Sequence, residues 1–197
     1  SSFSRAFYSI GSHTVTLEVT DSNGFRITLT VSFNVIPQPS VSFTTQYDTI
    51  DAGLQDIFTS SVSGGTSPYT YAWTVNGNIV GDSSSLAYTF NAAGSYAVNL
   101  TVNDSFCFTS TYSKTIQVVN DPEISIVANR TIIDSGLSIA FLSGISGGTS
   151  PYNYTWEING IVVGYGSVLD HTFTSSGTYT THLSVVDSFG LSSSYVV

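Results

Sequence analysis

A hexapeptide that occurs twice limits what this chain of 197 residues can fold into. Residues 64–69 read Gly-Gly-Thr-Ser-Pro-Tyr, and residues 147–152 repeat the same letters at an offset of 83. A fixed period of this length indicates tandem copies of one structural unit, so the fold of one copy is the fold of the chain. Other positions that match at this offset are Trp73 with Trp156, Asn76 with Asn159, Gly94 with Gly177, Tyr96 with Tyr179 and Asp104 with Asp187.

A third, shorter copy precedes these two. Gly11 aligns with Gly94 and Asp21 with Asp104 at the same offset. We therefore predict three segments. Residues 1–36 are the C-terminal part of a truncated repeat, 37–119 a complete repeat, and 120–197 a nearly complete repeat that lacks the end of its last strand. The chain is expected to be a piece of a longer array.

Each copy has the pattern of β-strands. Residues 69–75 alternate aromatic or apolar side chains with small polar ones, the period of two that marks a half-buried strand. Asn76-Gly77 favours a tight hairpin because both turn positions require positive φ. No segment sustains a period of 3.6. About seven short strands per copy predict an all-β chain of tandem antiparallel sandwiches of the immunoglobulin-like (Ig-like) type.

Two aromatic positions are predicted to form the structural core. Trp73 and Trp156 fall on the third predicted strand, where Ig-like sandwiches bury a tryptophan. Tyr96 and Tyr179 precede the penultimate strand, where a tyrosine corner bonds its hydroxyl to the loop backbone. His13 occupies the same position in the first copy and is expected to supply a similar donor.

The motif Gly-Gly-Thr-Ser-Pro-Tyr-x-Tyr-x-Trp, followed by Ala-Gly-Ser-Tyr-x-Val-x-Leu-x-Val-x-Asp, resembles PKD domains, the polycystic-kidney-disease type of Ig-like module. Many PKD domains carry Trp-x-Phe-Gly-Asp-Gly after the core tryptophan. Here Trp73 and Trp156 are followed by Thr-Val-Asn-Gly and Glu-Ile-Asn-Gly, a form similar to repeats of archaeal secreted and cell-surface proteins. The resemblance implies spacers, adhesive units or modules that bind proteins or carbohydrates.

Composition narrows the class of partner. Charged residues make up 9% of the chain and the net charge is −9, so a binding surface for nucleic acid is not expected. The single cysteine, Cys107, excludes an internal disulfide, and no apolar run is long enough to span a membrane. We expect an extracellular, cell-surface location, with neighbouring repeats of the same chain, other copies or surface proteins as partners.

Four Asn-x-Ser/Thr triplets are candidate glycosylation sites, although a surface rich in Asn and Thr also produces such triplets by chance. The linker at residues 120–123 is the candidate for calcium, because Asp121 and Glu123 offer carboxylate oxygens. The first linker has no carboxylate, and stiffening by proline is the alternative reading. No other cofactor is expected. The four triplets begin at Asn99, Asn103, Asn129 and Asn153.

Catalytic motifs do not emerge from the sequence. The three histidines do not share one repeat position, and no nucleophile elbow, zinc-binding helix motif or phosphate loop occurs. We therefore expect no enzyme, and the leading hypothesis is a structural spacer of a large cell-surface protein, in a stalk, surface layer or filament. The alternative is a carbohydrate- or protein-binding accessory module of a secreted hydrolase, with Tyr165 as the ligand contact.

Overall fold

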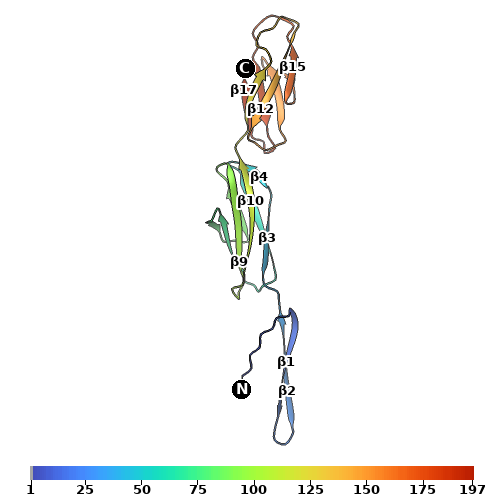
Figure 1. The fold of residues 1–197 in the computed structure, drawn as a ribbon, viewed down its shortest axis with the longest axis vertical. Coiled ribbons are helices and arrows are strands. Elements are labelled where there is room, and N and C mark those ends of the chain that lie inside the picture. The colour runs from blue at the N-terminus through green and yellow to red at the C-terminus, as the bar shows by residue number, and fades with distance from the viewer. Residues whose placement is uncertain (1) are drawn as a thin grey trace. The chain divides into compact units, whose positions relative to one another are not determined.

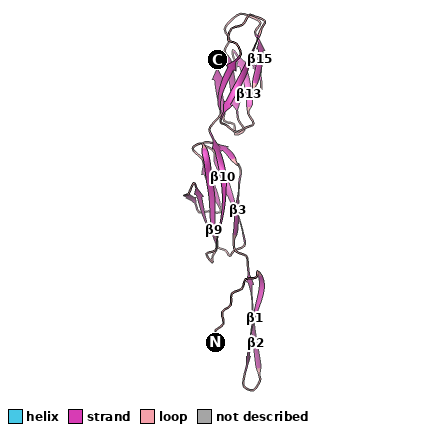
Figure 2. Cartoon of the chain, viewed as in Figure 1, coloured by secondary structure: helices cyan, strands magenta, loops and turns pink. Residues whose placement is uncertain are grey.

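The computed structural model describes residues 2–197, and it consists of strands, turns and loops (Figure 2). The prediction of an all-β chain of Ig-like sandwiches is confirmed. No helix long and apolar enough to span a membrane occurs in the described part of the chain.

The chain forms two compact units. One contains the residues up to Thr44 together with Phe58–Leu86 and Val98–Lys114, and the other contains Thr45–Ile57, Ala87–Ala97 and Thr115–Val197. The division between them passes through the second repeat, so the predicted segment boundaries at residues 36/37 and 119/120 stay predictions.

Residues 2–197 contain seventeen strands. Figure 1 colours them in chain order from the N-terminus to the C-terminus. The first segment holds β1 (Gly11–Thr20) and β2 (Arg26–Val35). The second repeat holds β3 (Ser40–Thr45), β4 (Thr49–Asp51), β5 (Gln55–Ser63), β6 (Thr70–Val75), β7 (Asn78–Gly81), β8 (Ser85–Thr89), β9 (Gly94–Asn103) and β10 (Thr109–Val119). The third repeat holds β11 (Glu123–Ala128), β12 (Ser138–Ser146), β13 (Asn153–Ile158), β14 (Ile161–Gly164), β15 (Val168–Thr172), β16 (Thr181–Val186) and β17 (Ser192–Val196).

The first segment is a two-stranded antiparallel hairpin. One of its faces carries three cross-strand apolar pairs, and their side chains are 37–72% exposed. The counterparts of the β1 members in the second repeat, on β9, are fully buried. The difference arises because residues 2–36 form no second sheet to cover this face. The pairs are Val15 with Val31, Leu17 with Leu29 and Val19 with Ile27.

The second repeat contains two sheets, with strand orders β3-β5-β8 and β4-β10-β9-β6-β7. One pairing departs from the antiparallel expectation, because β4 runs parallel to β10. The chain crosses from one sheet to the other between β3 and β4 and keeps its direction, so β4 adds to the far sheet as a parallel edge strand. This short strand places Ile50 and Asp51 in the interior, both with no exposed surface.

Trp73 on β6 is the centre of an aromatic cluster. It is fully buried, and its ring centroid lies 5.1 Å from that of Phe43 and 6.1 Å from that of Phe58. Its indole Nε1 donates to the carbonyl of Ser83 at 2.8 Å, which satisfies the one polar group of the buried ring.

The third repeat repeats this core. Its sheets have the orders β11-β12-β15 and β14-β13-β16-β17. Trp156 is fully buried, packs 6.1 Å from Phe141 and donates from Nε1 to the Gly166 carbonyl at 2.8 Å. The buried cluster around it contains Ile124, Ile139, Ile158, Leu169, Phe173, Leu183 and Val185.

The tyrosine corners are present in both long repeats, and the first segment has a counterpart. The Tyr96 hydroxyl donates to the Ala92 carbonyl at 2.9 Å, and the Tyr179 hydroxyl to that of Ser175 at 3.0 Å. His13 Nε2 lies 2.7 Å from the carbonyl oxygen of Ser9, at the same spacing of four residues. All three contacts hold the loop before the penultimate strand.

Candidate functional site: the linker and the base of the following repeat

The Gly-Gly pair of the repeated hexapeptide fastens the linker that precedes each repeat. Gly148 N–H donates to the Asn120 carbonyl at 2.6 Å. In the second repeat, Gly65 N–H donates to the Pro37 carbonyl at 2.7 Å. Each bond joins the start of a linker to the base of the repeat that follows, so both linkers are held in the same way.

These glycines are required by geometry as well as by backbone conformation. Gly147 has φ of +69°, and a Cβ there would collide with the Asp121 carbonyl oxygen and lie 2.8 Å from that of Asn120. Gly148 has φ of +66°, and its Cβ would lie 2.9 Å from Pro122 Cβ. Only glycine combines positive φ with this close approach of two backbones.

The tyrosine that ends the hexapeptide closes the same turn. The Tyr152 hydroxyl donates to the Gly147 carbonyl at 2.9 Å, and that of Tyr69 to the Gly64 carbonyl at 2.6 Å. Burial first, and then the nearby carboxylates of Asp187 and Asp51, raise the pKa of Tyr152. The phenol therefore stays protonated and remains a donor.

Asp187 organises the turn after β16 and is almost fully buried. Its Oδ1 accepts from the N–H groups of Phe189 and Leu191 at 3.0 and 2.9 Å, and its Oδ2 accepts from Thr149 N–H at 3.1 Å. Asp104 in the second repeat has the same three kinds of bond, from Phe106, Phe108 and Thr66. The recurrent aspartate is therefore a backbone acceptor, the role that a short carboxylate suits.

A second aspartate meets this turn from the second repeat. Asp51, at the end of β4, accepts a hydrogen bond on Oδ1 from the Thr149 hydroxyl at 2.6 Å. Its Oδ2 is buried and accepts from no donor within residues 2–197. Because Thr149 also bonds Asp187, the two carboxyl groups converge on one threonine. Asp51 and Asp187 belong to the same compact unit of the chain.

The pKa values of the two carboxyl groups are shifted in opposite directions. The pKa of Asp51 is raised to about 6, mainly by burial. A hydrogen bond to Asp187 and the charges of Asp187 and Asp121 also raise this pKa, whereas the hydrogen bond from Thr149 lowers it. Burial also opposes ionisation of Asp187, yet hydrogen bonds from Asp51 and from three backbone N–H groups lower its pKa. The pair therefore holds one proton, on Asp51, at mildly acidic pH.

An aromatic contact lies at the same junction. The rings of Tyr47 and Phe189 meet edge to face, with centroids 4.9 Å apart. Phe106, the counterpart of Phe189 in the second repeat, is 71% exposed. The same repeat position therefore packs against Tyr47 in the third repeat, as Phe189, and is exposed to solvent in the second repeat, as Phe106.

The candidate glycosylation sites differ in exposure. Asn129 and Asn153 are exposed, whereas Asn99 and Asn103 are half-buried. Asn99 Nδ2 donates to Thr74 Oγ1 at 3.4 Å, and Asn103 Oδ1 accepts from Thr109 Oγ1 at 2.5 Å. Asn129 Oδ1 accepts from Ala140 N–H at 3.0 Å. Asn153 is the first residue of β13.

The carboxylates suggested for calcium lie in the linker, at exposed positions. No group of three or more His, Cys, Asp or Glu side chains that could hold a metal is formed within residues 2–197. A calcium site at Asp121 and Glu123 stays a prediction. Tyr165, the suggested ligand contact, is 75% exposed between β14 and β15.

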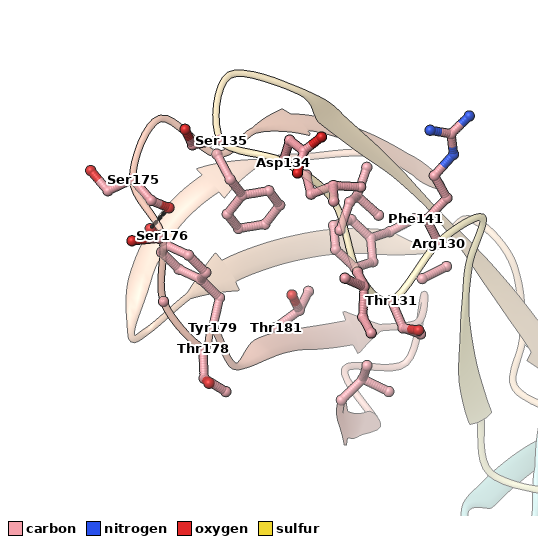
Figure 3. A pocket seen from close by; sticks show the side chains of 17 residues that line it. Arg130, Thr131, Asp134, Ser135, Phe141, Ser175, Ser176, Thr178, Tyr179 and Thr181 are labelled. Carbon is pink, nitrogen blue, oxygen red and sulfur yellow. Dashed lines mark hydrogen bonds between the residues drawn. The ribbon is translucent and has the colours of Figure 1, made fainter.

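A cavity of about 570 Å³ opens at the far end of the third repeat (Figure 3). Core side chains such as Phe141 and Tyr179 line it, together with residues 130–135 and 175–178. In the second repeat the corresponding region is occupied by β4 and the end of β10, whose Ile50, Ile116 and Val118 are buried. The cavity therefore lies where strands fill the sandwich of the second repeat, and its lining mixes core side chains with polar loop residues.

Sequence reasoning did not predict that Asp51 and Thr149 meet. A signal was available, because Asp51 recurs as Asp134 at the repeat offset and Thr149 recurs as Thr66. Neither position shows from the sequence that the two meet across a junction.

The fold is shared with solved structures of low sequence identity. Three N-terminal domains of the bacteriophage RB49 Highly Immunogenic Outer Capsid protein align over 81% of this chain with a TM-score of 0.53 and 16% identity. The N-terminal eight Ig domains of Down Syndrome Cell Adhesion Molecule align over 96%, with a TM-score of 0.54 and 14% identity. The two long repeats have the fold of tandem Ig-like domains.

An I-band fragment of titin also aligns, over 81% of the chain with a TM-score of 0.54 and 15% identity. The chain spans 58%, 37% and 64% of the lengths of these three Ig-like structures, in the order given. No protein-family model matches the sequence, and no curated protein matches it. At these identities the likeness establishes the fold.

Proposed function

We propose that this chain is a structural spacer segment of a large extracellular cell-surface protein, built from PKD-type Ig-like repeats of the archaeal kind. The observation that carries the proposal is the recurrent fastening of each linker. Gly65 bonds Pro37 and Gly148 bonds Asn120 in the same geometry, so the most closely repeated residues outside the core serve the joints between repeats. A protein whose role is to hold a distance needs such defined joints.

The stiffness of the joint can be measured by spin labelling. Labels on Cys introduced at exposed Thr115 and Ser192, in a Cys107→Ser background, report a distance across the second linker. We expect a narrow distance distribution for the parent chain. Gly147→Ala should broaden it, because the new Cβ collides with the linker carbonyl of Asp121.

The matched control is Gly136→Ala. Gly136 also has positive φ, +89°, but a Cβ there meets nothing within 4 Å. It should leave the distribution as narrow as in the parent chain. A parent distribution as broad as that of Gly147→Ala would contradict a defined spacer.

The location can be tested with an antibody raised against the chain. Intact cells of the source should bind it without permeabilisation. Binding that appears only after the cells are permeabilised would contradict the proposed surface location.

A second candidate function is carbohydrate binding, and the exposure of Tyr165 favours it, because aromatic rings stack on sugars from exposed positions. On a glycan array, Tyr165→Ala should abolish binding, whereas Ile161→Ala, at a position 68% exposed, should not. Absence of binding by the parent chain would remove this candidate.

A further inference from the structure

We propose that Asp51 and Asp187 share one proton and that this proton makes the contact between the second and third repeats a pH-dependent joint. The proposal rests on the spacer function for its biological use, since a joint matters only in an array. Its test measures the joint alone.

Asp51 Oδ2 is a buried oxygen with no hydrogen-bond donor among the described residues. Asp51 has no exposed surface, and its Oδ2 accepts no hydrogen bond from residues 2–197. A buried ionised carboxylate with an unsatisfied oxygen is costly. If Oδ2 instead carries a proton, it becomes a donor, and the carboxylate of Asp187 is the adjacent acceptor.

The second step is the surroundings of Asp187. Three backbone N–H groups already point at its oxygens, so the ionised form is the stabilised one. The proton therefore resides on Asp51 Oδ2 and is donated to Asp187. Titration releases this proton to solvent and leaves two adjacent carboxylates.

The third step is the charge around the pair. The titratable groups that act on it are Asp121 of the linker and Tyr152 of the following turn. Asp121 is negative and Tyr152 is a neutral phenol at physiological pH. Deprotonation puts a second negative charge beside Asp187, so like-charge repulsion opposes the Thr149 hydroxyl bond and the Tyr47–Phe189 contact at the junction.

Asp104 and Asp134 are the repeat counterparts of Asp187 and Asp51, and they do not form such a pair. Asp104 has the same backbone donors, and burial pushes its pKa up, but those bonds outweigh burial and lower it. No second carboxyl group contributes to that shift. Asp134, the counterpart of Asp51, is exposed. Asp104 and Asp134 are thus matched single carboxylates for the pair of Asp51 and Asp187.

The experiment uses the whole chain with the Thr115 and Ser192 labels at about pH 5 and about pH 7.5, on either side of the titration of Asp51. We expect the distance distribution to be narrow at the lower pH and broader at the higher one. Asp51→Asn carries an amide that donates as the protonated acid does, so its distribution should stay narrow at both. Asp134→Asn should behave as the parent chain does.

A carbon NMR titration of the aspartate carboxyl groups gives the direct readout. One carboxyl should titrate at a pKa of about 6, and its signal should vanish in Asp51→Asn. Asp104→Asn should leave it in place.

Two results would overturn the proposal. One is a distance distribution that does not change with pH in the parent chain. The other is a distribution of Asp51→Asn that broadens at about pH 7.5 as that of the parent chain does, which would place the pH response outside this pair. If the antibody does not bind intact cells but the distance distribution still changes with pH, the spacer function is rejected and the pH-dependent joint is retained.

Discussion

At the scale of single residues, Trp73 and Trp156 lie at the centres of the two cores, and replacing either should lower the free energy of unfolding. Trp156→Ala removes a fully buried ring and its hydrogen bond to the Gly166 carbonyl. We expect the free energy of unfolding of the third repeat to fall by about 3–5 kcal/mol. Urea denaturation followed by circular dichroism measures it.

Tyr165→Ala is the control in the same repeat, because that ring is 75% exposed. Its effect should stay within about 0.5 kcal/mol. Equal losses for the two variants would mean that Trp156 is not the centre of a packed core.

At the scale of elements, the hairpin turns between β6 and β7 and between β13 and β14 depend on positive φ at both turn residues. Asn76 and Gly77, between β6 and β7, have φ of 48° and 82°, and a Cβ on Gly77 would meet nothing within 4 Å. Gly77→Ala should therefore cost only the strain of positive φ, about 1 kcal/mol.

The equivalent change in the third repeat, Gly160→Ala, should cost the same, because Gly160 has φ of 79° and is equally open. Thermal unfolding of the two variants tests this equality. A loss several times larger in either would show that the turn glycine has a packing role that the structure does not contain.

At the scale of the whole molecule, the stability of the chain should depend on pH through Asp51. Its pKa is about 6 in the folded chain against 3.8 for the ordinary group. Between these values the folded state holds a proton that the unfolded state releases, so stability falls as the pH rises through 6. Asp187 has the opposite shift, and its contribution is lost as the pH falls below 3.8.

The free energy of the unfolding transition that includes the third repeat should therefore be highest near the acid end of this window and fall by about 3 kcal/mol towards neutral pH. Thermal unfolding of the parent chain and of Asp51→Asn across the range measures it. The net charge of −9 also changes with pH, so the difference between the two curves isolates Asp51. Parallel curves would contradict the prediction.

Much of the fold follows from local pattern. The period of two predicts the strands, Asn76-Gly77 predicts the hairpin turn, and the recurrent tryptophan predicts the centre of each core. These succeed because alternation and turn conformation are set by neighbours in the chain. The hairpin of residues 11–35 shows the boundary of such reasoning: its apolar face follows the same pattern and is exposed, since burial requires a second sheet.

The sequence by itself therefore determined the repeating unit with its strands and turns. Only the tertiary structure decided that β4 runs parallel to β10 and that Asp51 meets Thr149, 98 residues away. The physical reason is distance along the chain. A carboxyl group's partner across a junction depends on how whole repeats are placed by their linkers, and no local pattern of residues encodes that placement.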